Sequence, residues 1–409
     1  MPTATRPPSP DARFAPTRDA GLARLAEFLP QAGADYARLR NFDLPGHPHV
    51  SRLSPWLRHR LLTEAELLEA AWAAHGPASE KFRQEVLWRS YWKGWLELRP
   101  PVWIAYRQGL DRALDRIATE EGLRQVWESA CAGRTGIDGF DQWARELAAT
   151  GWLHNHARMW FASIWIFTLR LPWQLGADFF LRHLLDGDAA SNTLSWRWVA
   201  GLQTAGKTYL ATRFNIARFT EGRFDPDGLA EVAIPLPPDP VPPMGTLPLP
   251  RPFDTDPDLP TGLLLHEDDL SPGAADLVAL PRAIAGFACP QARSPLAVAP
   301  MVRTFTQDAV ARRLAALPPG AGAEILPATD PAEALLDWAR RHGLRRIVTA
   351  HAPVGATADA LALAEKKLGM EEITLHRVIT PYDADLWPRA THGFFRFHES
   401  VRGIKSGSS

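Results

Sequence analysis

The chain has little of several features that define whole classes of protein. Cys131 and Cys289 are its only cysteines, and without paired spacing they exclude a disulfide framework and a thiolate metal cluster. The formal net charge is -1, and neither the first 232 residues nor the remainder is strongly basic, so charge alone does not indicate nucleic-acid binding. The most apolar run, Met159 to Leu169, is about half a membrane span, which predicts a buried helix and no membrane partner. The opening MPTATRPPSP lacks a signal-peptide core, so we expect a cytoplasmic protein.

Helical patterns dominate the first half of the chain, which is also rich in tryptophan. Residues 1–12 are predicted to be a disordered tail, and residues 13–232 to form an all-helical domain, because apolar residues recur there at three- and four-residue spacing. In HRLLTEAELLEAAWAAHG, Thr63 is expected to cap a helix and Gly76 to end it. The 16 tryptophans of the chain indicate a large core, an aromatic binding site, or both.

The second half has a different pattern. Residues 233–260 are dense in proline, which favours extended backbone and predicts a linker. Beyond it, residues 261–409 are expected to form a smaller α/β domain with a parallel sheet, because short apolar runs alternate with helical stretches. Strands are predicted within GLLLHEDDL, AEILPA, RRIVTAHA and EEITLHRVI. Between them, DPAEALLDWARRHG should be a helix capped by Asp330, with Pro331 at its first position and Gly343 at its end.

Four segments of the helical half combine residue types suited to holding a ligand. VSRLSPWL (50–57) offers short hydroxyls and amides at a helix start, which suit an anion. QEVLWRSYW (84–92) places Glu85, Trp88 and Arg89 on one helical face. TGWLHNHARMWFAS (150–163) does the same for Asn155, Arg158 and Met159, and LLDGDAASNTLSWRW (184–198) has a glycine turn between Asp186 and Asp188.

Each segment also has a plainer interpretation. SRLSP can be an ordinary helix cap, each tryptophan a core residue, and DGD a surface turn or a divalent-metal loop. His154 and His156 are two apart and point away from each other on a helix, so no metal site is expected there.

Taken in order and at close to the same spacing, the four segments resemble the FAD-binding domain of the photolyase and cryptochrome family, over roughly Tyr36 to Phe219. The motifs they resemble are T-S-R-L-S-P, E-x-x-W-R-E-F-Y, T-G-x-x-H-N-x-x-R-M and L-x-D-G-D-x-A-x-N-x-x-x-W-x-W. Two positions depart from these patterns: Val50 stands in place of the usual threonine and Ser90 in place of an acid.

The resemblance implies FAD as the cofactor and assigns a set of residues to it. The flavin-site positions are Ser51, Arg52, Leu53, Ser54, Arg89, Arg158, Asp186, Asp188 and Asn192. Among them, Asp186 is expected to pair with Arg158, and Asn192 to face flavin N5, where photolyases typically have asparagine and plant cryptochromes aspartate.

The resemblance also implies DNA as a substrate. The positions that would contact a cyclobutane pyrimidine dimer are Glu85, Trp88, Asn155, Met159 and Trp198, and those that would transfer electrons are Trp196 and Trp173. The usual third electron-transfer tryptophan is missing near residue 117, where Trp127, Trp103 or a neighbouring tyrosine could substitute.

The expected function is therefore light-driven DNA repair by a deoxyribodipyrimidine photolyase-like lyase, with UV-damaged DNA as the partner. The first alternative is a cryptochrome-like photoreceptor that signals through a protein partner, and the second is a light-independent flavoprotein. In the family an α/β antenna domain precedes the flavin domain, whereas here the α/β half follows the linker. We therefore expect a permuted counterpart of the antenna domain, with the identity of any antenna chromophore left open.

Overall fold

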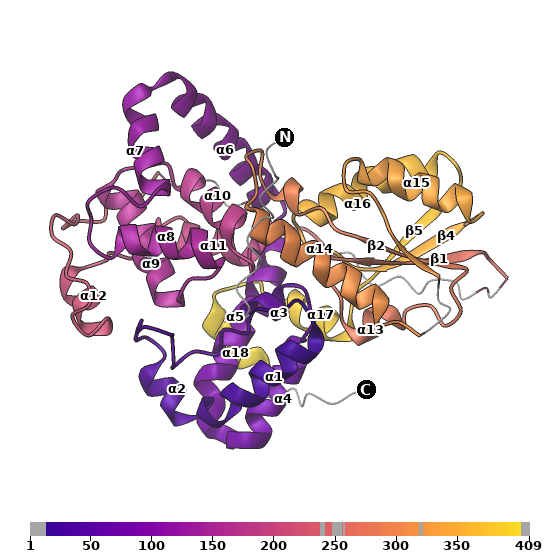
Figure 1. The fold of residues 1–409 in the computed structure, drawn as a ribbon, viewed down its shortest axis with the longest axis horizontal. Helices are drawn as coiled ribbons and strands as arrows, with labels where there is room; N and C mark the ends of the chain where they lie inside the picture. The colour runs from indigo at the N-terminus through magenta and orange to yellow at the C-terminus, as the bar shows by residue number, and fades with distance from the viewer. Residues whose placement is uncertain (1–13, 238–241, 248–255, 257, 319–321, 402–409) are drawn as a thin grey trace, which may run out of the picture.

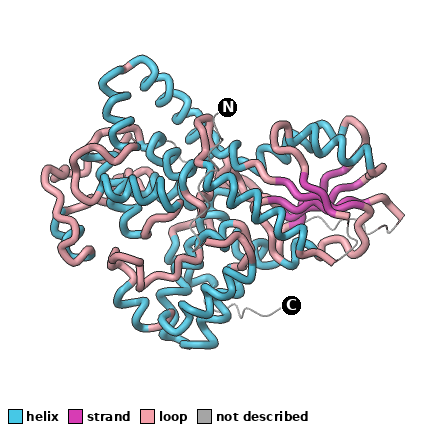
Figure 2. The backbone as a smooth tube through the Cα atoms, in the orientation of Figure 1, coloured by secondary structure: helices cyan, strands magenta, loops and turns pink. Residues whose placement is uncertain are grey.

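The structure is a computed structural model that describes residues 14–237, 242–247, 256, 258–318 and 322–401. The predicted tail, residues 1–12, lies outside the described residues, as does part of the predicted linker. The chain forms a large helical part and a smaller part built on one parallel sheet, as the sequence predicted (Figure 1, Figure 2). Among the described residues, no helix is long and apolar enough to cross a membrane.

The helical part extends from Arg18 to Phe219. Its helices are α1 (Arg18–Phe28), α2 (Ala34–Leu39), α3 (Ser54–Arg58), α4 (Glu64–His75), α5 (Glu80–Glu97), α6 (Pro101–Thr119), α7 (Glu121–Cys131), α8 (Phe140–Thr150), α9 (Asn155–Ser163), α10 (Trp173–His183), α11 (Ala189–Val199) and α12 (Arg213–Phe219). Thr63 caps α4 in a capping box with Glu66, and Gly76 ends it, which confirms both predicted boundaries. The apolar run after Met159 is buried, and α9 continues there as a π-helical turn, Ile164–Thr168.

The α/β part has five parallel strands in the order β3-β2-β1-β4-β5: β1 (Thr261–His266), β2 (Ala283–Phe287), β3 (Ala323–Ile325), β4 (Arg346–Ala350) and β5 (Thr374–Val378). Helices α13 (Pro272–Ala275), α14 (Pro300–Ala315), α15 (Pro331–Arg341) and α16 (Ala356–Gly369) cover its two faces (Figure 1). The chain reverses its direction of winding between β1 and β4, which makes this a doubly wound sheet. Asp330 caps α15, as predicted. Strand β2 and helix α14 were not anticipated from the sequence.

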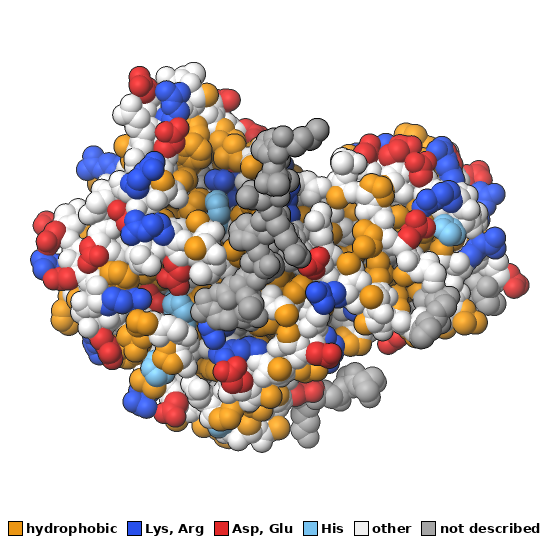
Figure 3. All heavy atoms as spheres, viewed as in Figure 1, with side chains coloured by type: hydrophobic (Ala, Val, Ile, Leu, Met, Phe, Trp, Pro, Cys, Tyr) orange, Lys and Arg blue, Asp and Glu red, His pale blue; other side chains and the backbone are white. Residues whose placement is uncertain are grey.

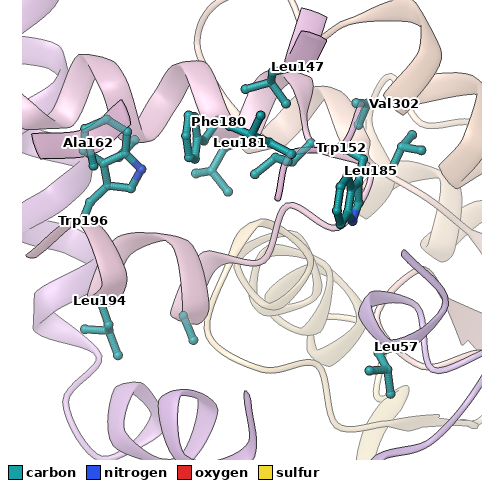
Figure 4. Close-up of a cluster of buried hydrophobic side chains, with 14 of the residues drawn as sticks. Leu57, Leu147, Trp152, Ala162, Phe180, Leu181, Leu185, Leu194, Trp196 and Val302 are labelled. Carbon is teal, nitrogen blue, oxygen red and sulfur yellow. The ribbon is translucent and has the colours of Figure 1, made fainter. Parts of the chain in front are cut away.

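The last described residues, up to Val401, return to the helical part. Helix α17 (Pro381–Leu386), the 3-10 turn Trp387–Arg389 and helix α18 (Phe394–Val401) pack against α5, about 300 residues earlier in the chain (Figure 1). The apolar core is continuous across the two parts. In Figure 4, for example, Val302 of α14 lies beside Leu185 and Trp152 of the helical part.

Gly94 marks the closest approach between α5 and this returning segment. A Cβ atom added at Gly94 would lie 2.7 Å from the Cα atom of Trp387. Alanine is the better helix former by about 1 kcal/mol, but overpacking costs about 1–3 kcal/mol, and a contact this short with backbone belongs to the upper part of that range, about 2–3 kcal/mol. We therefore expect Gly94→Ala to lower the free energy of unfolding by about 1–2 kcal/mol, measured by urea denaturation.

Gly122 provides the matched control for this prediction, because it also lies in a helix but has no heavy atom within 4 Å of an added Cβ. Gly122→Ala should raise stability, by at most about 1 kcal/mol. A Gly94→Ala protein as stable as the wild type would show that the returning segment does not press on α5 as described.

Candidate flavin and DNA site

The first predicted segment forms a loop fixed from two sides. Arg24 holds the backbone carbonyls of Val50 and Ser51 at 3.1 and 2.7 Å, and Leu53 is buried. The Oγ atom of Ser54 accepts a hydrogen bond from the indole N–H of Trp152 at 3.3 Å. Arg52 has a positive φ of 54°, a conformation that non-glycine residues seldom adopt and that often marks a binding loop.

A cavity of about 220 Å³ lies beside this loop and is lined by Arg52, His47, Gln142, Glu146, Thr150, Trp152 and Arg223, together with Phe14, Pro45 and Gly46. It is smaller than the roughly 300–1,000 Å³ of most small-molecule pockets, so it matches a portion of a dinucleotide and not the whole. Two arginines and the nearby serine hydroxyls give this end of the site donors for a phosphate group.

The third and fourth segments are joined by an ion pair and a backbone hydrogen bond. Arg158 Nη2 lies 2.8 Å from Asp186 Oδ2, which is the pairing that the resemblance predicted, and Leu185 N donates to Gly151 O at 2.8 Å. The other carboxylate oxygen of Asp186 is buried and has no hydrogen-bond partner among the described residues. A buried oxygen without a partner is costly, so this atom is suited to accept a hydrogen bond from a ligand.

Asp188 and the second segment form a charged cluster behind this pair. Asp188 caps α11 by accepting from Ser191 N at 2.9 Å, and Arg89 and Lys93 lie 3.4 and 3.8 Å from its carboxylate. Burial would raise the pKa of Asp188, but the charges of Arg89, Lys93 and Arg58 outweigh burial and hold that pKa well below its usual range. Asp188 is therefore an anion at neutral pH. One turn further along α11, the side-chain amide of Asn192 donates to Ala177 O at 2.8 Å.

The predicted DNA-contact residues have separate neighbours. Glu85 accepts a hydrogen bond from Arg40 at 2.7 Å, and burial raises the pKa of its carboxyl group although Arg40 opposes the shift. Trp88 stacks on Phe394, and Trp198 stacks on Tyr209 at 5.7 Å between ring centroids. The other two residues lie on α9, where Asn155 is exposed and Met159 is half-buried. Glu85, Trp88 and Arg89 lie three and four residues apart on α5, and their side chains reach three different partners: Arg40, Phe394 and Glu64.

Trp196 and Trp173 belong to two groups of aromatic rings. Trp196 is buried and packs edge-on against Trp165 and Phe180, with Phe180 also drawn in Figure 4. Trp173 has Tyr106 at 5.6 Å between ring centroids, and Tyr106 has Trp103 at 5.3 Å. Of the substitutes considered for the missing third tryptophan, a neighbouring tyrosine, Tyr106, thus lies next to Trp173, and Trp103 lies on the other side of Tyr106.

The departure from the motif at Ser90 has a structural reason. Its hydroxyl lies 2.9 Å from the hydroxyl of Tyr382 in α17, and the side chain is buried. A glutamate here would bury a charge against the phenol of Tyr382. Serine is small and neutral, and so allows α17 to pack on α5.

Several residues of the site were missed from the sequence. Lys93 lies four residues after Arg89 on the same helical face, and this spacing could have revealed it. Arg58 follows directly on the first motif, and its guanidinium bonds to Gly187 O at 2.7 Å and to Asp268. Asp268 comes from the α/β part, so no local pattern indicates this contact. Within the described residues, no group of metal-ligating side chains forms a metal site.

The carboxyl edge of the sheet, where doubly wound folds bind ligands, is filled by protein groups. The cavity there, at the ends of β1 and β4, is about 20 Å³, enough for a water molecule. Arg58, His59 and Arg60 of the helical part occupy this edge and contact Glu267, Asp268 and Asp269.

The geometry defines a helical ligand-binding domain whose four motif segments are bonded to one another, joined to a doubly wound α/β part. Residues 82–229 match the family model described as the FAD binding domain of DNA photolyase. The matched residues thus belong to a domain of the FAD-binding type found in DNA photolyase, with FAD as its cofactor class. The phosphate donors at Arg52 and the unsatisfied Asp186 oxygen fit such a group.

Known relatives cover the same half of the chain. A deoxyribodipyrimidine photo-lyase of Streptomyces griseus is 37% identical over 46% of this chain and 39% of its own length, and one of Thermus thermophilus is 36% identical over 52% and 49%. A cryptochrome DASH of Idiomarina loihiensis is 28% identical over 51% and 46%. A class III photolyase structure from Agrobacterium tumefaciens is 26% identical over 50% and 42%, with a TM-score of 0.42. The chain spans less than half the length of these relatives.

Proposed function

We propose that the protein is a light-driven DNA repair lyase that splits cyclobutane pyrimidine dimers with the help of FAD. The observation that carries the proposal is the convergence of the four motif segments. Hydrogen bonds and ion pairs join Ser54 to Trp152, Arg158 to Asp186, and Arg89 to Asp188. In addition, all five positions assigned to dimer contact retain the residue that the resemblance implies.

The chain's own residues bind and orient the cofactor. The chemistry that bound, reduced FAD would supply under blue light is the loan of one electron to the dimer, which would be returned after splitting. We assign Arg52 and the serine hydroxyls to the pyrophosphate, and Arg158 with Asp186 to the polar edge of the flavin ring. Asp188 fixes Arg89 and Lys93 in place, and buried Asn192 is assigned to the flavin N5 side.

The dimer is held by stacking and hydrogen bonds. Flipping a damaged pair out of the duplex costs a few kcal/mol, and stacking on an aromatic ring returns about 1–3 kcal/mol per base, so Trp88 and Trp198 can offset the cost. Glu85 is assigned to hydrogen-bond the pyrimidine edge; burial raises the pKa of its carboxyl group, and Arg40, bonded to one of its oxygens, opposes that shift. Asn155 and Met159 complete the polar and apolar contacts.

DNA binding must rest on local contacts, since acidic and basic side chains are interspersed on the face shown in Figure 3. We assign Trp196, Trp173, Tyr106 and Trp103 to electron transfer, with the last two replacing the missing third tryptophan. The α/β part is proposed as the permuted counterpart of the antenna domain, following the predicted boundaries of 261–409 after a linker at 233–260. Its doubly wound strand order supports that proposal, and no antenna chromophore is assigned.

The test is light-dependent repair. Purified protein with its FAD content measured by absorption is reduced, mixed with an oligonucleotide containing one thymine dimer, and exposed to blue light or kept dark. We expect restored thymines only in the light, and about tenfold weaker binding of the damaged DNA by Trp88→Ala. Trp72→Ala is the matched control, because Trp72 is exposed on α4 outside the motifs and contacts Arg83. Fully loaded protein that restores no thymines in the light would refute the proposal.

Salt-dependent binding of the same damaged DNA distinguishes a repair enzyme from a photoreceptor. A repair enzyme neutralises phosphates and should lose affinity for damaged DNA as salt rises, with a linear slope in a log-log plot. Flavin loading without any salt-dependent binding of damaged DNA would favour the photoreceptor. Trp196→Phe should abolish photoreduction of the flavin in a repair enzyme and in a photoreceptor. The activity of a light-independent flavoprotein would not change.

A further inference from the structure

The segment that ends the described chain supplies an aromatic ring to the proposed DNA site. Phe394, the first residue of α18, stacks on Trp88 of α5 with 3.7 Å between ring centroids and an interplanar angle of 8°. The two rings are therefore in full parallel contact, and one face of Trp88 is covered.

The burial of the two rings shows their order. Phe394 is 4% exposed, whereas Trp88 is half-buried, so Phe394 is the inner ring and Trp88 the outer one. Tyr91 is edge-on to both, at 5.6 Å from Trp88 and 5.7 Å from Phe394, and so restricts rotation of either ring. Trp92 also packs on Trp88, at 5.1 Å between ring centroids and an interplanar angle of 35°, so the exposed part of Trp88 is what Phe394, Tyr91 and Trp92 leave uncovered.

Other contacts fix α18 against α5. The hydroxyl of Tyr91 donates to His392 O at 2.8 Å, Phe397 packs on Tyr91, and His398 lies 3.0 Å from Glu80. Phe395, the next residue along α18, is 73% exposed and makes its one described ring contact with Phe394. Phe394 is thus held in place by several independent contacts, whereas Phe395 is not.

We propose that Phe394 is a positioning residue for pyrimidine binding: it fixes the plane of Trp88 so that the outer face of Trp88 can stack on the flipped base. This rests on the proposed function and extends it, because the substrate face of the helical domain then depends on the last helix of the chain. A ring already held in its binding orientation loses less conformational freedom when a base stacks on it, and this preorganisation raises affinity. The stack would run from Phe394 through Trp88 to the pyrimidine.

The test compares variants of Phe394 with a variant of its exposed neighbour. Affinity for a thymine-dimer oligonucleotide is measured by fluorescence anisotropy, and repair in blue light by its KM and kcat. We expect Phe394→Ala to weaken binding about tenfold and to raise KM with little change in kcat or in FAD content. Phe394→Tyr keeps the ring and should retain wild-type affinity, and Phe395→Ala should have no effect. Phe394→Leu retains apolar volume without a flat face, so it replaces Phe394→Ala should that variant fail to fold.

A second readout does not depend on DNA. In protein labelled with fluorotryptophan, the ¹⁹F resonance of Trp88, assigned with Trp88→Phe, should shift in Phe394→Leu because the ring current of Phe394 is lost, and stay in place in Phe395→Ala. If the wild type binds damaged DNA and Phe394→Ala and Phe394→Leu bind it equally well, the inference is wrong and the proposed function stands. If the wild type binds no damaged DNA, both fail. An unmoved resonance in Phe394→Leu would refute the stacking itself.

Discussion

Arg58→Ala should lower the free energy of unfolding by about 3–5 kcal/mol, the usual cost of removing one partner from a buried ion pair. Arg58 is 5% exposed and joins α3 to the turn at Gly187 and to the loop after β1. Its guanidinium donates to Gly187 O at 2.7 Å, pairs with Asp268, and lies 3.8 Å from Glu267. Without it, Glu267 would keep Arg293 at 3.7 Å, whereas Asp268 would lose its ion-pair partner.

The measurement is urea denaturation of the wild type, Arg58→Ala, Asp268→Ala and the double variant. Because the two side chains form one pair, the double variant should be less destabilised than the sum of the single variants. Arg213→Ala is the control, since Arg213 pairs with Asp225 and Asp227 on the surface and should leave the unfolding midpoint unchanged. Purely additive losses would mean that Arg58 and Asp268 do not act as a pair.

Helix and strand classes could be predicted where local rules decide them. Thr63 and Asp330 cap their helices through side-chain oxygens within three residues, so sequence was sufficient there. Strand β2, with the sequence AIAGF, was missed because it is a short buried run that lacks the alternation of a half-exposed strand. Helix α14 was missed with it, although Pro300 at its first position is a recognised start signal.

In the site, too, contacts within local motifs could be predicted and long-range contacts could not. Pairing of Arg158 with Asp186 followed from motifs that carry their own spacing, and the structure places the two side chains in contact. The roles of these residues toward a flavin stay predictions. The partners of Trp88, Ser90 and Arg58 come instead from residues about 200–300 positions later in the chain, so no pattern within one helix could reveal them.

The returning segment, from α17 to α18, makes three of these contacts with α5. Ser90 meets Tyr382, Gly94 makes room for Trp387, and Trp88 meets Phe394, so this segment contacts more than one face of α5. Each of these α5 residues has a contact to the end of the chain that differs in kind: a hydrogen bond, a close backbone approach and a ring stack. Helix α5 is therefore at once the carrier of a ligand motif and the docking surface for the C-terminal helices, which couples the site to the α/β part.

Acid should destabilise the protein well before its carboxylates titrate, because His154 is buried in neutral form. Burial lowers the pKa of His154 from 6.5 to about 3, nearby Asp43 opposes the shift, and His47 adds to it. As pH falls below 6.5, the unfolded chain takes up a proton that the native state refuses, so the unfolded state gains stability at about 1.4 kcal/mol per pH unit. His154 alone should therefore cost about 2 kcal/mol between pH 6.5 and pH 5. The penalty is complete near pH 3.

His154→Asn isolates this effect, because asparagine does not titrate and can keep the N-cap acceptor that His154 Nδ1 offers to His156 N at 3.1 Å. Urea denaturation at pH 8 and pH 5 should show a pH-dependent loss about 2 kcal/mol smaller in the variant than in the wild type. His183, whose pKa burial lowers to about 4, should contribute in the same direction, so His154→Asn reduces the loss without removing it. Parallel losses in wild type and variant would mean that His154 accepts its proton in the folded state, and that the burial beneath the TGWLHN segment is looser than described.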